Sequence, residues 1–206
     1  MTIRLHRGDL PDLSHYRGDA VAIDTETMGL DPNRDRLCVV QLSPGDGSAD
    51  VVQIPAGTNQ HAPNLTKLLT DASVLKIFHF ARFDLGILRK HFGVMPGPVY
   101  CTKIASRLAR TYTDRHGLKD LVREVLNVDL SKQQQSSDWG SEALSDAQVA
   151  YAASDVTYLH ALREKLDAML LREGRADLAA ACFEFLPERV RLDLAGWADD
   201  DIFAHS

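Results

Sequence analysis

Residues 20–27 have the sequence Ala-Val-Ala-Ile-Asp-Thr-Glu-Thr, an apolar run that ends in two acidic residues. Successive side chains of a β-strand point to opposite faces, so Asp24 and Glu26 share one face at the end of the predicted strand. Buried carboxylates need a neutralising partner, and Mg²⁺ prefers oxygen ligands while keeping positions open for phosphate. In a lone Asp-x-Glu pair, the aspartate more often begins a turn and the glutamate is solvated. A metal site therefore needs further acidic residues elsewhere in the chain to support it.

The chain length and composition favour one globular domain in a reducing compartment. Its 206 residues are enough to bury a sizeable core. The three cysteines are scattered and lack metal-site spacing, which argues against a disulfide framework and a zinc site. The N-terminus has no hydrophobic signal core and no apolar run approaches membrane-spanning length, so we expect a cytoplasmic protein without a membrane partner.

The charge balance limits how this chain would hold a nucleic acid. It has 29 acidic and 23 basic residues, a formal net charge of −6. Proteins that grip long nucleic acids by their phosphates usually present a basic face, and this sequence has no dense run of Lys and Arg. If the substrate is a nucleic acid, we expect few phosphates to be contacted.

The spacing of apolar residues predicts strands first and alternating strands and helices afterwards. Strands are expected at residues 2–6, 19–26, 37–42, 50–54, 74–78 and 99–101, the second to fourth forming an antiparallel meander. Helices are expected around 65–69, at 81–92, around 104–108 with Thr102 as N-cap, at 118–126, and from a capping box at 145–148 to about Gly174. This order predicts an α/β domain with a mixed β-sheet flanked by helices.

Three further residues could accompany Asp24 and Glu26. Asp84 falls in the first turn of the helix after the 74–78 strand, where sites collect in open α/β sheets. Tyr151 and Asp155 are four residues apart and share one face of the predicted long helix. Taken singly, Asp84 is more often an acid that complements the helix dipole, and the Tyr151–Asp155 pair an ordinary boundary contact.

The spaced combination resembles the DEDDy 3′–5′ exonucleases of the RNase D-like family. Residues 24–27 look like the first motif, residues 75–84 the second, and Ser137-Asp138-Trp139 followed by residues 151–156 the third with its lead-in. The resemblance covers roughly residues 1–170, and the combination is specific although each piece is not. It implies an RNase H-like fold. The short chain resembles the nanoRNase C members, which degrade very short RNA and form ring-like homo-oligomers such as octamers.

The resemblance also implies a catalytic site with two divalent cations, Mg²⁺ or Mn²⁺. Asp24 would bridge both ions, Glu26 and Asp155 would complete one site, and Asp84 would support the other. The Tyr151 hydroxyl would orient the attacking water, which requires a group within hydrogen-bond reach. The predicted reaction is hydrolysis of short single-stranded RNA, dinucleotides included, to nucleoside 5′-monophosphates.

Substrate contacts are predicted for eight further residues: Thr25, Thr27, Met28, Leu30, His79, Lys132, Gln135 and Ser137. Backbone groups of residues 25–28 would recognise the terminal 3′-OH, and Leu30 would wedge against the terminal base. His79 would approach the scissile phosphate, and the other three polar side chains would bind a phosphate. Structural alternatives exist for five of them: a turn leucine folded onto the core for Leu30, a hydrogen-bonded core histidine for His79, and a solvated polar loop for Lys132, Gln135 and Ser137.

Two other functions are compatible with the same motifs. One is trimming of longer RNA or DNA in the manner of RNase D. RNA and DNA substrates remain alternatives because contact with the ribose 2′-OH cannot be seen in a sequence. The other is a catalytically inactive exonuclease fold that serves as a binding module, although all four acids and the tyrosine are present.

Residues 1–206 are predicted to be one exonuclease domain with its catalytic core at about 1–174. We therefore expect no helical nucleic-acid-binding domains like those that follow the catalytic domain of RNase D. Residues 175–206 are predicted to form a C-terminal helix and tail. Apolar residues after Pro187 alternate along the tail, which predicts that it docks on its own core or on a neighbouring subunit.

Overall fold

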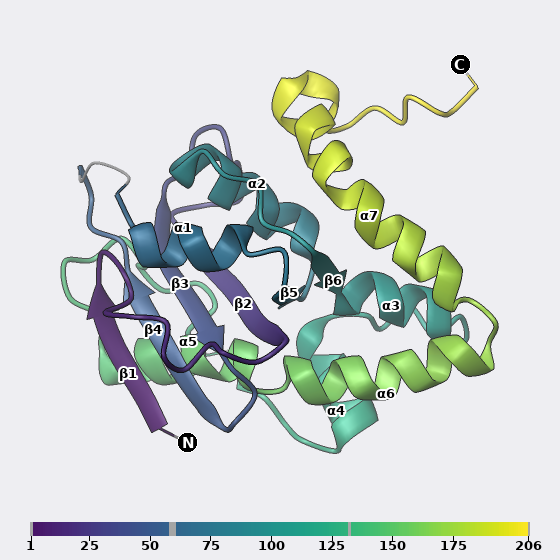
Figure 1. The fold of residues 1–206 in the computed structure, drawn as a ribbon, viewed down its shortest axis with the longest axis horizontal. Coiled ribbons are helices and arrows are strands. Elements are labelled where there is room, and N and C mark those ends of the chain that lie inside the picture. The colour runs from purple at the N-terminus through teal and green to yellow at the C-terminus, as the bar shows by residue number, and fades with distance from the viewer. Residues whose placement is uncertain (1, 58–60, 132, 206) are drawn as a thin grey trace.

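A six-stranded mixed β-sheet lies at the centre of the computed structural model, which describes residues 2–57, 61–131 and 133–205 (Figure 1). Its strands are β1 Thr2–Arg7, β2 Ala20–Thr27, β3 Leu37–Ser43, β4 Ser48–Gln53, β5 Leu75–Phe78 and β6 Val99–Cys101. They lie in the order β1-β4-β3-β2-β5-β6. Strands β2, β3 and β4 form the predicted antiparallel meander, whereas β1 joins β4, β5 joins β2 and β6 joins β5 in parallel.

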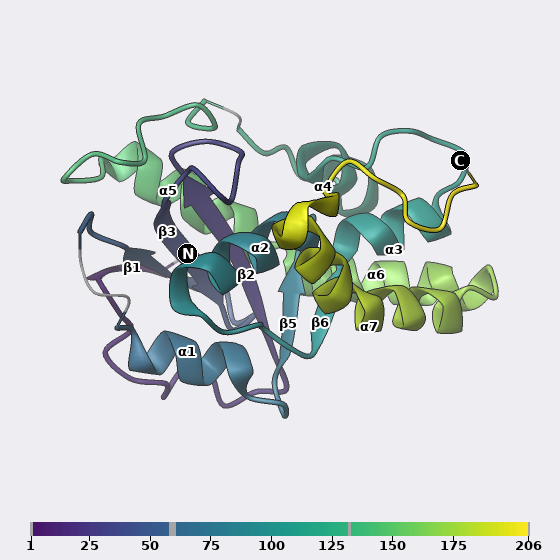
Figure 2. The ribbon, with the colours of Figure 1, turned by 90° about the horizontal axis from the view of Figure 1, so that it is seen from above.

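Helices cover both faces of this sheet. They are α1 Pro63–Thr70, α2 Ala81–Phe92, α3 Thr102–Ala109, α4 Leu118–Leu126, α5 Asp146–Thr157, α6 Leu159–Arg172 and α7 Ala176–Leu192, followed by a π-helical turn at Asp193–Trp197. Seen from above, α1 and α2 lie on one side of the sheet and α5 on the other (Figure 2). Among the described residues, no helix is both long enough and apolar enough to cross a bilayer.

Alternation along β2 places its acidic residues toward α5. Val21 and Ile23 belong to the core layer shared with α1 and α2, whereas Ala20 and Ala22 belong to the layer shared with α5 and α6. Asp24 and Glu26 continue the register of the two alanines, so they point to the α5 side. Two alanines of α5, Ala152 and Ala153, are fully buried, and their small side chains let this helix lie close to the sheet.

Two details of the helix predictions are wrong around Thr102 and Tyr158. Cys101 is the N-cap of α3, and the Thr102 hydroxyl instead donates to the Phe78 carbonyl at 3.2 Å. The Ser145 capping box is present, but its helix ends at Thr157 and α6 begins at Leu159. The Thr157 hydroxyl donates to the Ala153 carbonyl at 2.7 Å, a back-bond that bends helices. The predicted single helix is therefore divided at Tyr158.

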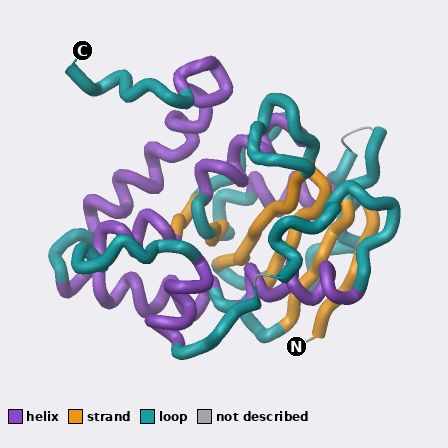
Figure 3. The backbone as a smooth tube through the Cα atoms, turned by 180° about the vertical axis from the view of Figure 1, so that it is seen from behind, coloured by secondary structure: helices purple, strands orange, loops and turns teal. Residues whose placement is uncertain are grey.

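The C-terminal segment is helical further than the sequence pattern predicts. Helix α7 continues through Pro187 to Leu192, and Leu186 and Val190 are both buried because residues four apart share a helix face. Beyond it, Trp197, Ile202 and Phe203 are exposed, and the chain ends away from the sheet (Figure 3). The tail therefore docks on its own core through α7 and the turn that follows it, where Leu194 packs against the core and Asp193 pairs with Arg82 of α2. Docking on a neighbouring subunit stays a prediction.

Candidate active site

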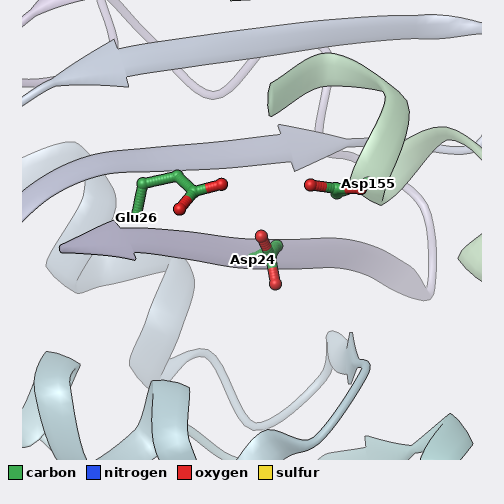
Figure 4. Close-up of side chains that lie close together, drawn as sticks. All are labelled: Asp24, Glu26 and Asp155. Atoms are coloured by element: carbon green, nitrogen blue, oxygen red, sulfur yellow. The ribbon is translucent and has the colours of Figure 1, made fainter. Parts of the chain in front are cut away.

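Three carboxylates gather where the end of β2 faces α5. One oxygen from each of Asp24, Glu26 and Asp155 lies within 4.8 Å of the others, and all three side chains are half-buried (Figure 4). Like charges this close repel one another unless protons or a cation neutralise them. A cluster of carboxylate oxygens is the donor set that Mg²⁺ and Mn²⁺ prefer. The residues therefore fit a divalent metal ion.

Asp84 approaches the cluster from the opposite face of β2. It lies in the first turn of α2 and is only 2% exposed. Its Oδ1 accepts a hydrogen bond from the Thr25 hydroxyl at 2.7 Å. Because Thr25 is the residue between Asp24 and Glu26 in a strand, its side chain points to the α2 side. Asp84 is thus held beside the first strand acid but outside the three-carboxylate group.

Burial and mutual repulsion raise the proton affinity of the whole cluster. Burial raises the pKa of Asp24 to about 7. Burial, followed by the charges of Asp24, Asp155 and Asp84, raises the pKa of Glu26 to about 10. The pKa values of Asp84 and Asp155 are also well above the usual range, through burial first and the charge of Asp24 second. Cation binding at neutral pH therefore has to displace protons from the site.

Gln41 holds the central carboxylate from the neighbouring strand. It lies directly opposite Asp24 in the antiparallel β2–β3 pair, so both side chains are on the same face. Gln41 is fully buried, and its Nε2 donates to Asp24 Oδ2 at 2.8 Å. Gln41 was not among the residues predicted from the sequence. A polar residue inside the apolar run 37–42 was the available signal, but its partner depends on the strand register.

Tyr151 adds a hydroxyl group beside Asp155. Burial first, and then the charges of Asp155, Glu26 and Asp24, raise the pKa of Tyr151 above its ordinary value. The hydroxyl keeps its proton at neutral pH and donates a hydrogen bond that works to lower the pKa of Asp155. The Tyr151 ring is tilted against Trp139, with centroids 6.0 Å apart. Packing against Trp139 restricts the ring and keeps the hydroxyl near Asp155.

The acids lie in an open cleft of about 670 Å³. Seven of the predicted substrate contacts line it: Thr25, Thr27, Met28, Leu30, His79, Gln135 and Ser137. The eighth, Lys132, lies outside the described residues. Leu30 is 86% exposed, so the alternative that folds it onto the core is wrong. The Ser137 hydroxyl donates to Gln134 Oε1 within the polar loop.

His79 joins the segments at the edge of the cleft. Its Nδ1 lies 2.9 Å from the Thr102 hydroxyl, and it also has a backbone hydrogen bond with His116. Burial, followed by the charge of Lys103, lowers the pKa of His79 to about 3. The imidazole is therefore neutral at physiological pH, and it fixes the β5–α2 and β6–α3 junctions relative to each other.

Seven further residues line the cleft but were not predicted from the sequence: Gly29, Phe80, Phe83, Lys103, Gly117, Leu118 and Ser136. Adjacency in the sequence was a signal for Gly29, Phe80, Phe83 and Ser136, because each is the neighbour of a predicted site residue. Lys103 and residues 117–118 carried no such signal, because their position depends on β6 pairing with β5.

Comparison with known proteins places this chain in a family. The model of the 3′–5′ exonuclease family matches residues 12–171. Ribonuclease D of Acidiphilium cryptum is 39% identical over 160 residues, which are 78% of this chain and 40% of that protein. The chain therefore spans about two fifths of the length of this curated relative.

Several solved structures match over their whole length, among them two with bound groups. Brucella melitensis NrnC with bound Mg²⁺ is 64% identical with a TM-score of 0.96, and both chains are covered to 100%. Brucella melitensis NrnC bound to pGG is 66% identical with a TM-score of 0.97 and the same coverage. The mixed sheet with flanking helices is the RNase H-like fold of these exonucleases, as predicted. The chain belongs to the 3′–5′ exonuclease family, as an RNase D-like member of the NrnC type.

Proposed function

We propose that this chain is a metal-dependent 3′–5′ exoribonuclease that hydrolyses short single-stranded RNA, dinucleotides included, to nucleoside 5′-monophosphates. The observation that carries the proposal is the group of carboxylates from Asp24, Glu26 and Asp155 in an open cleft. The similarity of the whole chain to NrnC bound to pGG supports a short substrate.

Four carboxylates would hold two divalent cations, Mg²⁺ or Mn²⁺. Asp24, Glu26 and Asp155 offer oxygens close enough to share one ion, and Asp84 with Asp24 would hold the second. Two such ions would polarise the attacking water and neutralise the charge that develops on the phosphate and the leaving oxygen. Gln41 fixes one Asp24 oxygen, so the carboxylate that both sites share cannot rotate freely.

Tyr151 would position the attacking water. Its hydroxyl donates to Asp155, so its oxygen lone pairs remain available to accept a hydrogen bond from a water in the cleft. Because the pKa of Tyr151 is raised, the hydroxyl stays protonated and does not act as the base at neutral pH. Its task in this proposal is to orient the water toward the phosphorus atom.

The rim of the cleft would hold the substrate end. Backbone groups of residues 25–28 would bind the 3′-OH, and exposed Leu30 would pack against the terminal base. Gln135, Ser137 and His79 line the cleft and would contact phosphate. The predicted phosphate contact of Lys132 is retained as part of the proposal.

Substrate length gives the direct test of this function. Among the described residues lining the cleft, Lys103 is the single lysine or arginine, and the chain has a net charge of −6. We expect little affinity from phosphates distant from the cleft, so a dinucleotide should be hydrolysed at least as fast as longer RNA. The measurement is digestion of a labelled RNA series from two to twenty nucleotides with Mg²⁺ or Mn²⁺.

Salt dependence supplies the control for that experiment. Dinucleotide affinity should fall only shallowly as monovalent salt rises, because few counterions are released. Faster turnover of the twenty-nucleotide RNA with a steep salt slope would instead indicate RNase D-like trimming of longer strands. No hydrolysis of any RNA in the series, or of DNA strands of the same lengths, would indicate a binding module.

We also propose that the chain assembles into a ring-like homo-oligomer through its C-terminal region. Several apolar side chains there are exposed: Leu171, Leu178, Phe185, Trp197, Ile202 and Phe203. Clusters of exposed apolar residues mark association surfaces. Phe185 on α7 and Phe203 in the tail already pack together with ring centroids 6.0 Å apart.

Light scattering tests this assembly. The full chain should have a mass several times that of one chain at micromolar concentration, and the double change Trp197→Ser and Phe203→Ser should lower it. The single change Leu5→Ser, at an exposed apolar residue on the distant edge strand β1, should leave the mass unchanged. A monomeric full chain at that concentration would contradict the proposal.

A further inference from the structure

We propose that Phe80 is a stacking platform for one nucleobase of the substrate, with the Lys103 ammonium seated on the other face of its ring. The inference rests on the proposed function and deepens it by adding a base-binding subsite. Phe80 comes from the β5–α2 junction and Lys103 from α3, and both line the cleft that contains the carboxylates.

The backbone of Phe80 is held in an unfavourable conformation. Its φ of 66° and ψ of 46° lie in the left-handed region, which only glycine and, less readily, asparagine and aspartate adopt without strain. Bulky residues persist in this region only where the surrounding structure fixes them, and such positions concentrate at ligand-binding and catalytic sites. A smaller residue would suffice to form this turn. The strain at this junction therefore points to a further local role for the phenylalanine side chain.

The ring of Phe80 remains open to the cleft. It is 44% exposed, although the residues before and after this junction, Phe78 and Ala81, are fully buried. Phenylalanine is usually buried because its ring has no polar group to solvate. An exposed, fixed aromatic ring beside a phosphodiester-binding site offers a flat apolar surface to a base.

Lys103 occupies one face of this ring. Its Nζ lies over the ring, 4.2 Å from the centroid, which is a favourable cation–π distance. None of the ion pairs of the described residues includes this lysine. Because the ammonium covers one face, a base would stack on the other.

A hydrogen-bonded support fixes the two residues relative to each other. His79, which precedes Phe80, pairs through Nδ1 with the Thr102 hydroxyl, which precedes Lys103. The same hydroxyl donates to the Phe78 carbonyl at 3.2 Å. This link joins the two junctions directly behind the platform, so the ring and the ammonium are organised before a ligand arrives, which lowers the entropic cost of binding.

The chemistry selects a nucleobase as the occupant. Every base has a π-face, and stacking on an aromatic side chain gives affinity without demanding one base identity. The platform would therefore hold a base in an otherwise strongly acidic cleft and would tolerate different bases at that position.

The test compares Phe80→Asn with Phe80→Tyr. Asparagine tolerates the left-handed conformation but has no ring, whereas tyrosine keeps the ring. Binding of a non-hydrolysable dinucleotide is measured against two analogues, each lacking the base at one of its nucleosides. Tyr112→Asn is the control, because Tyr112 is also an exposed ring beside a cation, Arg110, but does not line the cleft. Thermal unfolding checks that each variant is folded.

Phe80→Asn should weaken binding of the intact dinucleotide about 5- to 150-fold, the range for one lost base–aromatic stack. Phe80→Tyr and Tyr112→Asn should bind like the wild type. The wild type should bind one of the two analogues more weakly than the intact dinucleotide, by the same factor of about 5- to 150-fold. Phe80→Asn should bind that analogue and the intact dinucleotide with equal affinity, since the base and the ring act as a pair. This comparison within the wild type remains informative even if Phe80→Asn fails to fold.

The platform would be overturned if folded Phe80→Asn bound the dinucleotide as tightly as the wild type. It would also be overturned if Phe80→Asn lost affinity by the same factor for the intact dinucleotide and for both analogues. Either result would leave the proposed exoribonuclease in place. A change in oligomer mass without base dependence would assign the ring to a subunit contact and overturn the platform as well. If the wild type neither binds nor hydrolyses short RNA, the platform and the proposed function fail together.

Discussion

Asp24→Asn should abolish hydrolysis of short RNA and should raise the melting temperature of the metal-free protein. Asparagine keeps the shape of the side chain and still accepts the hydrogen bond from Gln41, but it removes the charge at the centre of the carboxylate cluster. Burial raises the pKa of Asp24 from near 3.8 to about 7, so the folded protein is destabilised wherever this group must ionise. In a domain of this size, each kcal/mol recovered raises the melting temperature by about 2–4 °C.

The pH dependence gives this prediction a sign. Between pH of about 4 and 7 the folded state binds more protons than the unfolded state at Asp24, because its folded pKa is the higher one. Stability of the metal-free wild type should therefore fall as pH rises through this window, and the fall should be smaller in Asp24→Asn. Added Mg²⁺ should stabilise the wild type and not the variant. Differential scanning calorimetry from pH 4 to 8, with and without Mg²⁺, measures both effects.

Asp50→Asn is the matched control, since Asp50 is a buried carboxylate of the same sheet with the opposite environment. Burial tends to raise the pKa of Asp50, but hydrogen bonds from Arg4, Tyr16 and His6 outweigh it and lower the pKa to about 2. Its stabilising contribution is present above pH of about 4 and is lost as pH falls toward 2. Asp50→Asn should therefore lower the melting temperature at neutral pH.

Retained RNA turnover in purified Asp24→Asn would contradict the metal-site assignment.

The parts of the site that follow from local periodicity could be predicted from the sequence. Alternation along residues 20–27 places Asp24 and Glu26 on one face, and helical spacing places Tyr151 and Asp155 on another. Neither pattern brings the two faces together. The motif order supplied that expectation, and the structure brings Asp155 against the strand acids because buried alanines let α5 lie close to the sheet.

Residues whose position depends on long-range pairing could not be predicted. Gln41 meets Asp24 only because β2 and β3 pair in that register, and a shift by one residue would turn it to the other face. Lys103 reaches Phe80 because β6 follows β5 in the sheet. The break at Tyr158 was hidden because the apolar spacing continues across it into α6.

Tyr151→Phe should slow hydrolysis by about 10²–10⁴-fold while leaving the fold and metal affinity unchanged, the range typical of a positioned proton-handling group. Phenylalanine keeps the ring that packs on Trp139 and loses only the hydroxyl. Since the Tyr151 hydroxyl donates to Asp155 and works to lower its pKa, the variant should also need a higher pH to reach its maximal rate. Single-turnover rates across pH, together with Mn²⁺ binding measured by calorimetry, test both effects.

Tyr158→Phe and Tyr151→Leu separate orientation of water from packing. Tyr158 is half-buried on the same stretch of chain but does not line the carboxylate cleft, so Tyr158→Phe should keep the wild-type rate. Tyr151→Leu loses both the hydroxyl and the ring, and it should lower the melting temperature as well as the rate. If the hydroxyl orients the water, Tyr151→Phe and Tyr151→Leu should lose similar rate but differ in stability. If Tyr151→Phe instead keeps the wild-type rate when chemistry is rate-limiting, the ring serves packing alone and another group must position the water.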